Sequence, residues 1–374
     1  MGIIFLLFVC SMFLFMFKDP IVIKYYDVDI NYREDYNILE KIGVKTNKKI
    51  DTTILHSGEI VETYDGFKHI IKYNVKDMTP PVMMWVGNVV IKKGDKFNYK
   101  NRLLCVDNYD KSVNYIVSGE YDLNKLGKYN LKYIATDSSG NKTEKKFTLT
   151  VVEEYSSSSS TSSSNDYFSF DELKKNYKND NTLVGIDVSS WQGDINWKKV
   201  KEAGCDFVII RVGFGHKNTE LVYDTYFKDN LIEAQENGIE VGLYFYSYAK
   251  TIKEAEEQAT WIIDSLDGRN IELPIAFDFE DWSNFKNYNM SLYDINDVAN
   301  AFMNKIKNSG YNAMLYGSAS YLNNIWFESK YPTWLAHYTR KTDFSKDYYI
   351  WQLSNNGRID GIYGAVDLNV LYKK

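Results

Sequence analysis

The chain has 374 residues, which at about 100–200 residues per domain is enough for two or three domains. Its composition is 44% hydrophobic, 25% charged and 16% aromatic, which excludes a disordered chain and a multi-span membrane protein. Its three Cys argue against a disulfide framework, and its four His, which lack paired spacing, argue against a zinc enzyme. The net charge of −6 divides into +4 for residues 18–152 and −10 for residues 153–374, and the acidic half has no basic cluster of the kind that binds nucleic acid.

The N-terminal segment is an apolar run over residues 3–17, interrupted by Ser11 and followed by Lys18-Asp19-Pro20. About 15 residues is short for a membrane span of about 20 and long enough for the apolar part of a signal peptide. A positive stretch before it and an A-x-A-like cleavage site after it are both missing, and Val9 before Cys10 is too large for a lipoprotein signal. We therefore expect residues 1–17 to form an uncleaved membrane anchor, with a cleaved signal segment as the alternative; either places the remainder outside the cytoplasm.

Residues 18–152 are rich in short alternating runs and contain a repeat with a period of about 60 residues. Ser-Gly-Glu begins the copies at residues 57 and 118, a Gly follows at 66 and 127, and Lys-Tyr-x-x-x-Asp ends at Asp77 and Asp137. This spacing predicts two small antiparallel sandwiches, at 18–78 and 79–152. Asp107 and Asp110 could bind calcium, although acidic residues in turns more often only cap the turn.

The second copy resembles bacterial surface immunoglobulin-like repeats in three motifs, and the first copy matches only in its second half. The motifs are Asp77-x-Thr-Pro-Pro81, Asp107-Asn-Tyr-Asp110 and Ala135-Thr-Asp-Ser-Ser-Gly-Asn141. The resemblance implies a spacer or a weak wall-binding module without catalytic residues. Residues 156–164 are all Ser except Thr161, so we expect a flexible linker over 153–182. Cys105 and Cys205 fall in different predicted domains, and we expect no disulfide between them.

Residues 183–374 alternate between strand-like and helical patterns. Apolar runs typical of strands lie at 184–188, 207–212, 241–246, 275–279 and 313–316. Helices are predicted at 196–203, 223–237, after the capping box at Thr251, and from Ser291 to Gly310. Three further strands are predicted at 333–337, 349–353 and 364–368, too close together for full helices between them. The pattern predicts an α/β fold, an irregular (β/α)8-type barrel with its last helices lost, and an open doubly wound sheet is the alternative.

Acidic side chains recur where the predicted strands end, which is where such barrels carry their sites. Asp187 is near the end of the first strand, Asp278 and Glu280 end the fourth, and Asp367 ends the last. Residues at i and i+2 on a strand share a face, so Asp278 and Glu280 point together, about 7 Å apart, into the barrel lumen. A surface pair meeting Lys or Arg is the alternative, and it would require the neighbouring phenylalanines to face the lumen.

Clustered carboxylates in one pocket cannot all ionise cheaply, so at least one pKa must rise. A protonated carboxyl beside ionised carboxylates is what glycoside hydrolysis requires. Aromatic residues flank the same strand ends and could cover the faces of sugar rings, although each could equally be a core residue. They are Trp191, Tyr244, Tyr246, Trp282, Tyr316, Trp334 and Trp351.

The chain over 183–374 resembles glycoside hydrolase family 25, the N-acetylmuramidases of bacteria and their phages. The matching blocks, in order, are Gly185-Ile-Asp-Val-Ser-Ser-Trp-Gln-Gly193, residues 207–211, residues 242–246, Asp278-Phe-Glu280, residues 334–338, Trp351-Gln352 and Val366-Asp-Leu-Asn369. The resemblance implies cleavage of the β-1,4 bond between N-acetylmuramic acid and N-acetylglucosamine in bacterial peptidoglycan. It also implies that the enzyme needs no metal or cofactor, and we expect a monomer.

Catalytic roles follow from the same resemblance. Glu280 would be the general acid, Asp278 would orient the substrate's acetamido group or stabilise the developing cation, and Asp187 and Asp367 would complete the acidic floor. The residues expected to bind substrate are Tyr246, Tyr316, Trp334, Gln352 and Arg211. The alternatives are a chitinase, whose longer acidic signature is missing before Asp278, an inactive wall-binding protein, and an adhesin that uses the β repeats.

Overall fold

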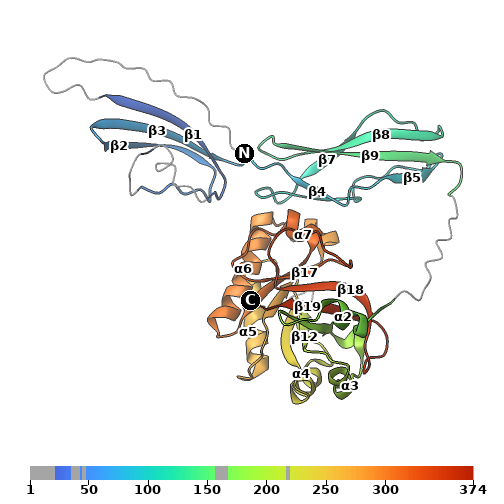
Figure 1. The fold of residues 1–374 in the computed structure, drawn as a ribbon. Helices are drawn as coiled ribbons and strands as arrows, with labels where there is room; N and C mark the ends of the chain where they lie inside the picture. Colours follow the sequence, from blue (N-terminus) through green and yellow to red (C-terminus); the bar gives the residue numbers. More distant parts are fainter. Residues whose placement is uncertain (1–21, 35–42, 44–47, 156–166, 216–219, 374) are drawn as a thin grey trace. The chain divides into compact units, whose positions relative to one another are not determined.

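The structure is a computed structural model that describes residues 22–34, 43, 48–155, 167–215 and 220–373. The predicted anchor at 1–17 and the serine run at 156–164 lie outside the described residues. Among those residues, no helix has the length and apolar character needed to cross a membrane. The chain divides into two compact units, and each is treated by itself (Figure 1).

A three-stranded sheet comes first, made of β1 (Ile23–Asn31), β2 (His56–Tyr64) and β3 (Phe67–Lys76) in the order β1-β3-β2. β2 and β3 form a hairpin whose two turn residues both have positive φ, as a type I′ turn requires. β1 runs parallel to β3, so the predicted antiparallel arrangement is wrong here. The parallel pairing is possible because β2, which is antiparallel to both, returns the chain to the edge of the sheet at which β1 and β3 begin.

A second group of strands, the β4–β9 module, covers residues 82–152. Its strands are β4 (Val82–Met84), β5 (Val89–Lys92), β6 (Leu104–Val106), β7 (Asn114–Ser118), β8 (Gly127–Thr136) and β9 (Lys142–Val152). β4 pairs with β6, and the others form a sheet in the order β5-β9-β8-β7. Tyr133 and Phe147 stack in its core with their ring centroids 4.2 Å apart. In the two sequence repeats, Lys-Tyr-x-x-x-Asp occupies the same place at the end of β3 and of β8, whereas Ser-Gly-Glu begins β2 but ends β7.

The C-terminal unit is a closed barrel of eight strands. They are β11 (Thr182–Val188), β12 (Phe207–Gly215), β14 (Glu240–Tyr246), β15 (Ile275–Asp278), β16 (Ala313–Ser318), β17 (Thr333–Ala336), β18 (Ile350–Arg358) and β19 (Val366–Tyr372). They are hydrogen-bonded in this order, and β19 pairs with both β18 and β11. The predicted irregular barrel is therefore confirmed, because an open sheet would leave two edges.

β19 differs from its prediction, because it runs antiparallel to both neighbours and starts at Val366. Asp367 therefore lies at the beginning of its strand instead of at the end. An antiparallel strand begins at the barrel edge where its parallel neighbours finish, so the side chain still reaches the edge that carries the other acids.

Helices cover the outside of the barrel. They are α2 (Phe170–Tyr177), which follows the short strand β10 (Phe168–Ser169), α3 (Trp197–Glu202), α4 (Phe227–Glu236), α5 (Ile252–Leu266), α6 (Leu292–Asn308) and α7 (Ala319–Asn324). Short 3-10 helices cover Ser190–Gln192 and Trp282–Tyr288. α4 begins later than predicted, because residues 221–223 form β13 (Leu221–Tyr223) against β12 and Asp224 accepts the N–H of Tyr226 at 3.0 Å.

Alternation along β15 separates the lumen from the helix layer as predicted. Ala276 belongs to the lumenal core, while Phe277 contacts Phe302 of α6 on the outside. The lumenal core consists of Phe207, Ile209, Leu273, Ala276, Met314, Tyr316, Trp334, Ala336, Ile350 and Leu371. The acidic residues at the strand ends lie next to this apolar core.

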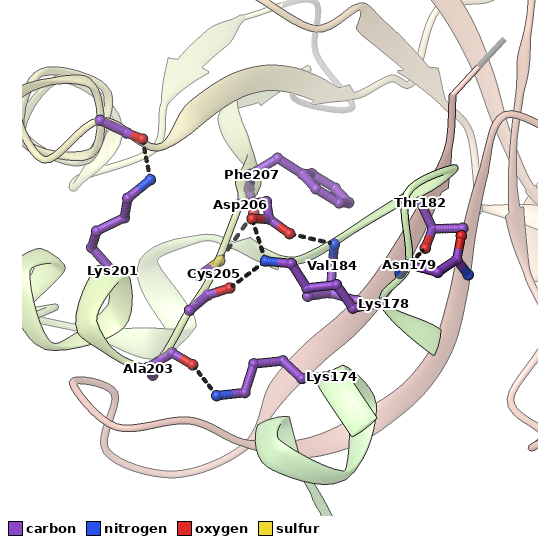
Figure 2. A network of polar contacts seen from close by, with 12 residues as sticks. Lys174, Lys178, Asn179, Thr182, Val184, Lys201, Ala203, Cys205, Asp206 and Phe207 are labelled. Carbon is purple, nitrogen blue, oxygen red and sulfur yellow. Dashed lines mark hydrogen bonds and ion pairs between the residues drawn. The ribbon is translucent and has the colours of Figure 1, made fainter. Parts of the chain in front are cut away.

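A polar network at the other end of the barrel ties the starts of β11 and β12 to α2 and α3 (Figure 2). Asp206 accepts the N–H of Val184 at 3.0 Å and the Nζ of Lys178 at 2.6 Å. Lys174 Nζ donates to the carbonyl of Ala203 at 2.6 Å. These bonds fasten the first two strands at the end away from the acids.

Candidate active site

A pocket of about 350 Å³ opens at the carboxyl ends of the parallel strands, and every residue that the sequence predicts as catalytic or substrate-binding lines it. These residues are Asp187, Arg211, Tyr246, Asp278, Glu280, Tyr316, Trp334, Gln352 and Asp367. A larger hollow of about 1120 Å³ lies near the residues that precede β15, β16 and β17, at the opposite end of these strands. Its acidic residues Glu272, Glu328 and Asp347 are all exposed, so it lacks the buried acids of the smaller pocket.

Asp187 and Asp367 are directly paired across β11 and β19. Asp187 is buried and accepts Nδ2 of Asn369 at 2.7 Å and Nε2 of Gln352 at 2.9 Å, and the same Nε2 donates to Asp367 at 3.0 Å. Burial raises the pKa of Asp187 to about 6. Burial and the neighbouring Asp187, with which it shares a hydrogen bond, raise the pKa of Asp367 to about 9. The two carboxyl groups therefore share one proton near neutral pH, held mainly by Asp367.

The amide groups beside this acid pair are held in one orientation by hydroxyl and indole donors. Gln352 Oε1 accepts the hydroxyl of Tyr316 at 2.9 Å and that of Tyr338 at 3.2 Å, so its Nε2 must point to the carboxylates. Asn369 Oδ1 accepts Nε1 of Trp334 at 2.8 Å, which turns its Nδ2 toward Asp187 in the same way. These fixed donors are what allow Asp187 to keep a negative charge when buried.

Asp278 and Glu280 occupy the end of β15. Asp278 is 3% exposed, and its buried Oδ1 has no hydrogen-bond partner. Burial, then the charges of Glu280 and Asp187, raise the pKa of Asp278 well above its ordinary value, while Arg211 opposes the shift. Glu280 is exposed at the pocket mouth, but the surrounding walls exclude part of its hydration, and this desolvation together with Asp187 raises its pKa as well. The pair thus retains a proton at higher pH than isolated carboxylic acids would.

Arg211 reaches the pocket wall without contacting the acidic floor. Its Nε and Nη2 bind one oxygen of Asp224, at 2.8 and 2.7 Å, and Nη2 also donates to Ser190 at 3.0 Å. Asp224 is almost fully buried and accepts the N–H of Ser190 as well, at 2.8 Å. Arg211 therefore holds the turn after β11 in place and acts on Asp278 through its charge.

Two of the aromatics predicted to bind substrate are mostly buried where they line the pocket. Trp334 is 1% exposed and Tyr316 is 7% exposed, because both rings fill the barrel lumen. Their polar atoms are committed to Asn369 and Gln352, so they support the acids from below. Tyr246, which is in register with Asp278 on the neighbouring strand, remains at the pocket wall as predicted.

Sequence reasoning missed two members of the site. Asn369 lies two residues after Asp367, so the i, i+2 rule that paired Asp278 with Glu280 would have placed it on the same face. Tyr338 is 53% exposed and lies in the loop after β17. Its position gave no periodic signal, although it belongs to one of the blocks that carry the family resemblance.

A barrel with proton-retaining carboxyl groups at the carboxyl ends of its strands provides the groups that a glycosidase of the carboxylate type requires. Comparison with known proteins identifies the family. The family model "Glycosyl hydrolases family 25" matches residues 186–362, and "Bacterial surface protein, Ig-like domain" matches residues 87–151. The chain belongs to glycosyl hydrolase family 25, with an immunoglobulin-like domain of bacterial surface proteins before it.

Named relatives share the barrel region. Lysozyme M1 of Streptomyces globisporus is 31% identical over 202 residues, which cover 50% of this chain and 67% of the relative. The autolytic lysozyme of Clostridium acetobutylicum is 27% identical over 190 residues, covering 50% of this chain and 55% of the relative. Among solved structures, the modular autolysin LytC from Streptococcus pneumoniae is 27% identical and covers 64% of this chain and 56% of its own, with a TM-score of 0.47.

Proposed function

We propose that this protein is a muramidase that hydrolyses the β-1,4 bond between N-acetylmuramic acid and N-acetylglucosamine in bacterial peptidoglycan. The observation that carries the proposal is the convergence of Asp187, Asp278, Glu280 and Asp367 in one pocket of a family 25 barrel. The names of two relatives, Lysozyme M1 and an autolytic lysozyme, support peptidoglycan as the substrate.

In this proposal Glu280 is the general acid. The proton donor must touch the glycosidic oxygen, and of the four acids Glu280 is the one exposed at the pocket mouth. Its raised pKa keeps it protonated at a pH where ordinary glutamates are ionised. The cleaved bond leaves positive charge on the sugar ring, and the carboxylates beneath it stabilise that charge.

Asp278 acts on the substrate from below. Asp278 lines the pocket beside Glu280, and its raised pKa lets its carboxyl group donate as well as accept a hydrogen bond to a substrate group. The acetamido group of an N-acetylated sugar has both an N–H and a carbonyl oxygen to offer. Asp187 and Asp367 complete the floor, where their shared proton leaves one negative charge beneath the reacting sugar.

We further propose that the enzyme works outside the cell at the wall, and that residues 1–17 anchor it to the membrane. The match of residues 87–151 to surface-protein domains supports an external location, and the apolar run at 3–17 supports the anchor. The β strands at 18–78 and 79–152 and the serine run at 156–164 would then separate the barrel from the membrane. The predicted linker at 153–182 is too long, and the barrel begins before residue 183, because β10 pairs with β18 and α2 contacts β11 and β19. Tethering would raise the local enzyme concentration at an anionic wall that the acidic barrel does not attract by charge.

Digestion of purified peptidoglycan by wild-type protein and by the Glu280→Gln variant tests the proposal. Analysis of the reducing ends by mass spectrometry should find reducing N-acetylmuramic acid with wild type only. Reducing N-acetylglucosamine ends would leave a hydrolase but contradict the assigned bond. Glycan that binds to both proteins and is cut by neither would identify a wall-binding module instead.

A further inference from the structure

Three aspartates from separate loops meet inside the β4–β9 module. Asp77 lies just before β4, Asp107 follows β6, and Asp137 follows β8. All three are buried, and one carboxylate oxygen from each lies within 4.8 Å of the other two. The catalytic proposal makes no use of this cluster.

Turn capping pairs only one of the two carboxylate oxygens of Asp77 and only one of those of Asp107. Asp77 Oδ1 accepts the N–H of Thr79 at 3.1 Å and Nδ2 of Asn108 at 2.9 Å, but its Oδ2 is buried without a partner. Asp107 Oδ1 accepts two backbone N–H groups of its own turn, both at 2.8 Å, and its Oδ2 is also buried without a partner. A carboxylate that only capped a turn would expose its second oxygen to water, because burying it unpaired is costly.

A neutral side chain beside the aspartates, that of Asn108, also has a buried oxygen without a hydrogen-bond partner. Asn108 is 5% exposed and its Oδ1 has no partner. Its Nδ2 donates to Oδ1 of Asp77, so the amide group lies beside the cluster. A donor is therefore missing for an amide oxygen as well as for the acids, which points to an absent ligand and not to mutual repulsion of carboxylates alone.

In the described part of the chain, no Lys, Arg or His forms an ion pair with Asp77, Asp107 or Asp137. Burial, then the charges of Asp77 and Asp137, raise the pKa of Asp107 to about 6. A bound cation would relieve both the repulsion and the unpaired oxygens.

We propose that Asp77, Asp107, Asp137 and the carbonyl oxygen of Asn108 form a calcium site. All the donors are oxygens, which hard divalent cations prefer. Oxygens bound to one Ca²⁺ at about 2.3–2.6 Å lie at most about 5 Å apart, and the three aspartates fit within that spread. Calcium accepts irregular sets of six to eight oxygens, as loops of different origin supply, with water completing the shell, whereas Mg²⁺ requires a near-ideal octahedron.

The ion would join three loops that are about 30 residues apart in the sequence. One of them is the entry to the module, where Asn31 at the end of β1 binds Thr79 and the N–H of Met78 at 2.9 Å each. Calcium would thus fasten the segment that follows the β1–β3 sheet to the body of the module. Calcium binding would therefore make this junction more rigid.

Calorimetric titration of the full chain with CaCl₂, after treatment with a chelator, tests this site. We expect wild type to bind calcium and Asp107→Asn to bind it at least about tenfold more weakly, since the variant keeps the oxygen that caps the turn but loses a charge. Asp95→Asn is the matched control, because Asp95 is an exposed turn residue of the same module. Thermal unfolding should show calcium raising the melting temperature of wild type and of Asp95→Asn, and having little effect on Asp107→Asn.

Asp77→Asn provides a second variant if Asp107→Asn fails to fold, with the same expected loss. Terbium luminescence sensitised by the adjacent Tyr109 and displaced by calcium gives a readout that needs no variant. Absence of binding and of any thermal shift in wild type at about 10 mM CaCl₂, roughly tenfold above the dissociation constants of the weakest extracellular sites, would overturn the proposal. Calcium binding of equal strength in wild type, Asp77→Asn and Asp107→Asn would overturn it too, because the ion would then be bound elsewhere.

Discussion

Replacing Gln352 by Ala should both destabilise the barrel and disturb its acids. The side chain is 2% exposed and makes four hydrogen bonds, two to carboxyl groups and two from tyrosine hydroxyls. A hydrogen bond to a charged group contributes about 1.5–3 kcal/mol, and a buried hydroxyl left unpaired, as that of Tyr316 would be, costs about 1–3 kcal/mol. Because these terms belong to one network and do not add fully, we expect a loss of about 4 kcal/mol in the free energy of unfolding.

Two assays read this change. At about 2–4 °C per kcal/mol for a domain of this size, the melting temperature of the barrel should fall by about 12 °C. The bond from Gln352 also lowers the pKa of Asp187, so its loss should move the acid limb of the pH–activity profile to higher pH. A mere packing defect would lower stability without moving that limb.

Gln192→Ala is the matched control, since Gln192 lines the same pocket but uses its amide for the N–H of Ser189 and the carbonyl of Ala365. It leaves both carboxylates fully paired, and we expect it to cost less than about 1.5 kcal/mol and to leave the pH profile unchanged. If Gln352→Ala proved no more destabilising than Gln192→Ala, the reasoning about the acid network would be refuted.

Three further changes are predicted. The raised pKa of Asp367 means that the folded barrel binds a proton more tightly than the unfolded chain. Stability should therefore be highest in mild acid and fall as the pH rises through about 9. Thermal unfolding across pH 5–10 should show this slope, and Asp367→Asn should flatten it. Arg211→Ala should cost about 3–5 kcal/mol in urea unfolding, because Asp224 would stay buried without its partner, and a cost below 1 kcal/mol would show that water replaces the guanidinium. Asp206→Ala, at the opposite end of the barrel, should lower the free energy of unfolding by about 1–2 kcal/mol, because it loses the bonds to Lys178 and to a backbone N–H. It should leave kcat/KM unchanged, because Asp206 does not touch the pocket. A fall in kcat/KM under conditions where the variant is fully folded would contradict this separation of the two ends of the barrel.

Local patterns predicted the parts of the barrel in which neighbouring residues set the structure. The apolar faces of α5 and α6 are buried as their helical periodicity indicates. The caps at Thr251 and Ser291 accept the N–H groups of Glu254 and Asp294, as the sequence suggests. Cys205 is free and buried, and Cys105 is free, in agreement with the expectation that they form no disulfide. The helix faces and caps depend on residues three or four positions apart, which a sequence displays directly.

Features that depend on distant residues were missed or wrong. The start of α4 was misplaced because β13 gains its hydrogen bonds from β12, which the local pattern of residues 221–223 does not reveal. The aspartate cluster of the β4–β9 module was recognised only at Asp107, since its partners Asp77 and Asp137 are each about 30 residues away. Burial of Trp334 likewise follows from closure of the barrel, because a strand-end aromatic faces a ligand or fills the lumen depending on what lies across from it.

The direction of β19 determines the chemistry of the floor. A parallel strand would offset its side chains from those of β11, whereas antiparallel pairing sets Asp367 directly opposite Asp187, with Cα atoms about 4.5–5.5 Å apart. At that separation two carboxylates cannot both stay ionised, so one proton is shared and the floor keeps a single charge beside Gln352. The same pairing brings Asn369, two residues along β19, to Asp187 from the other side. The last strand therefore supplies both the acid that faces Asp187 and a fixed amide donor to Asp187, which a regular parallel strand ending at residue 367 would not achieve.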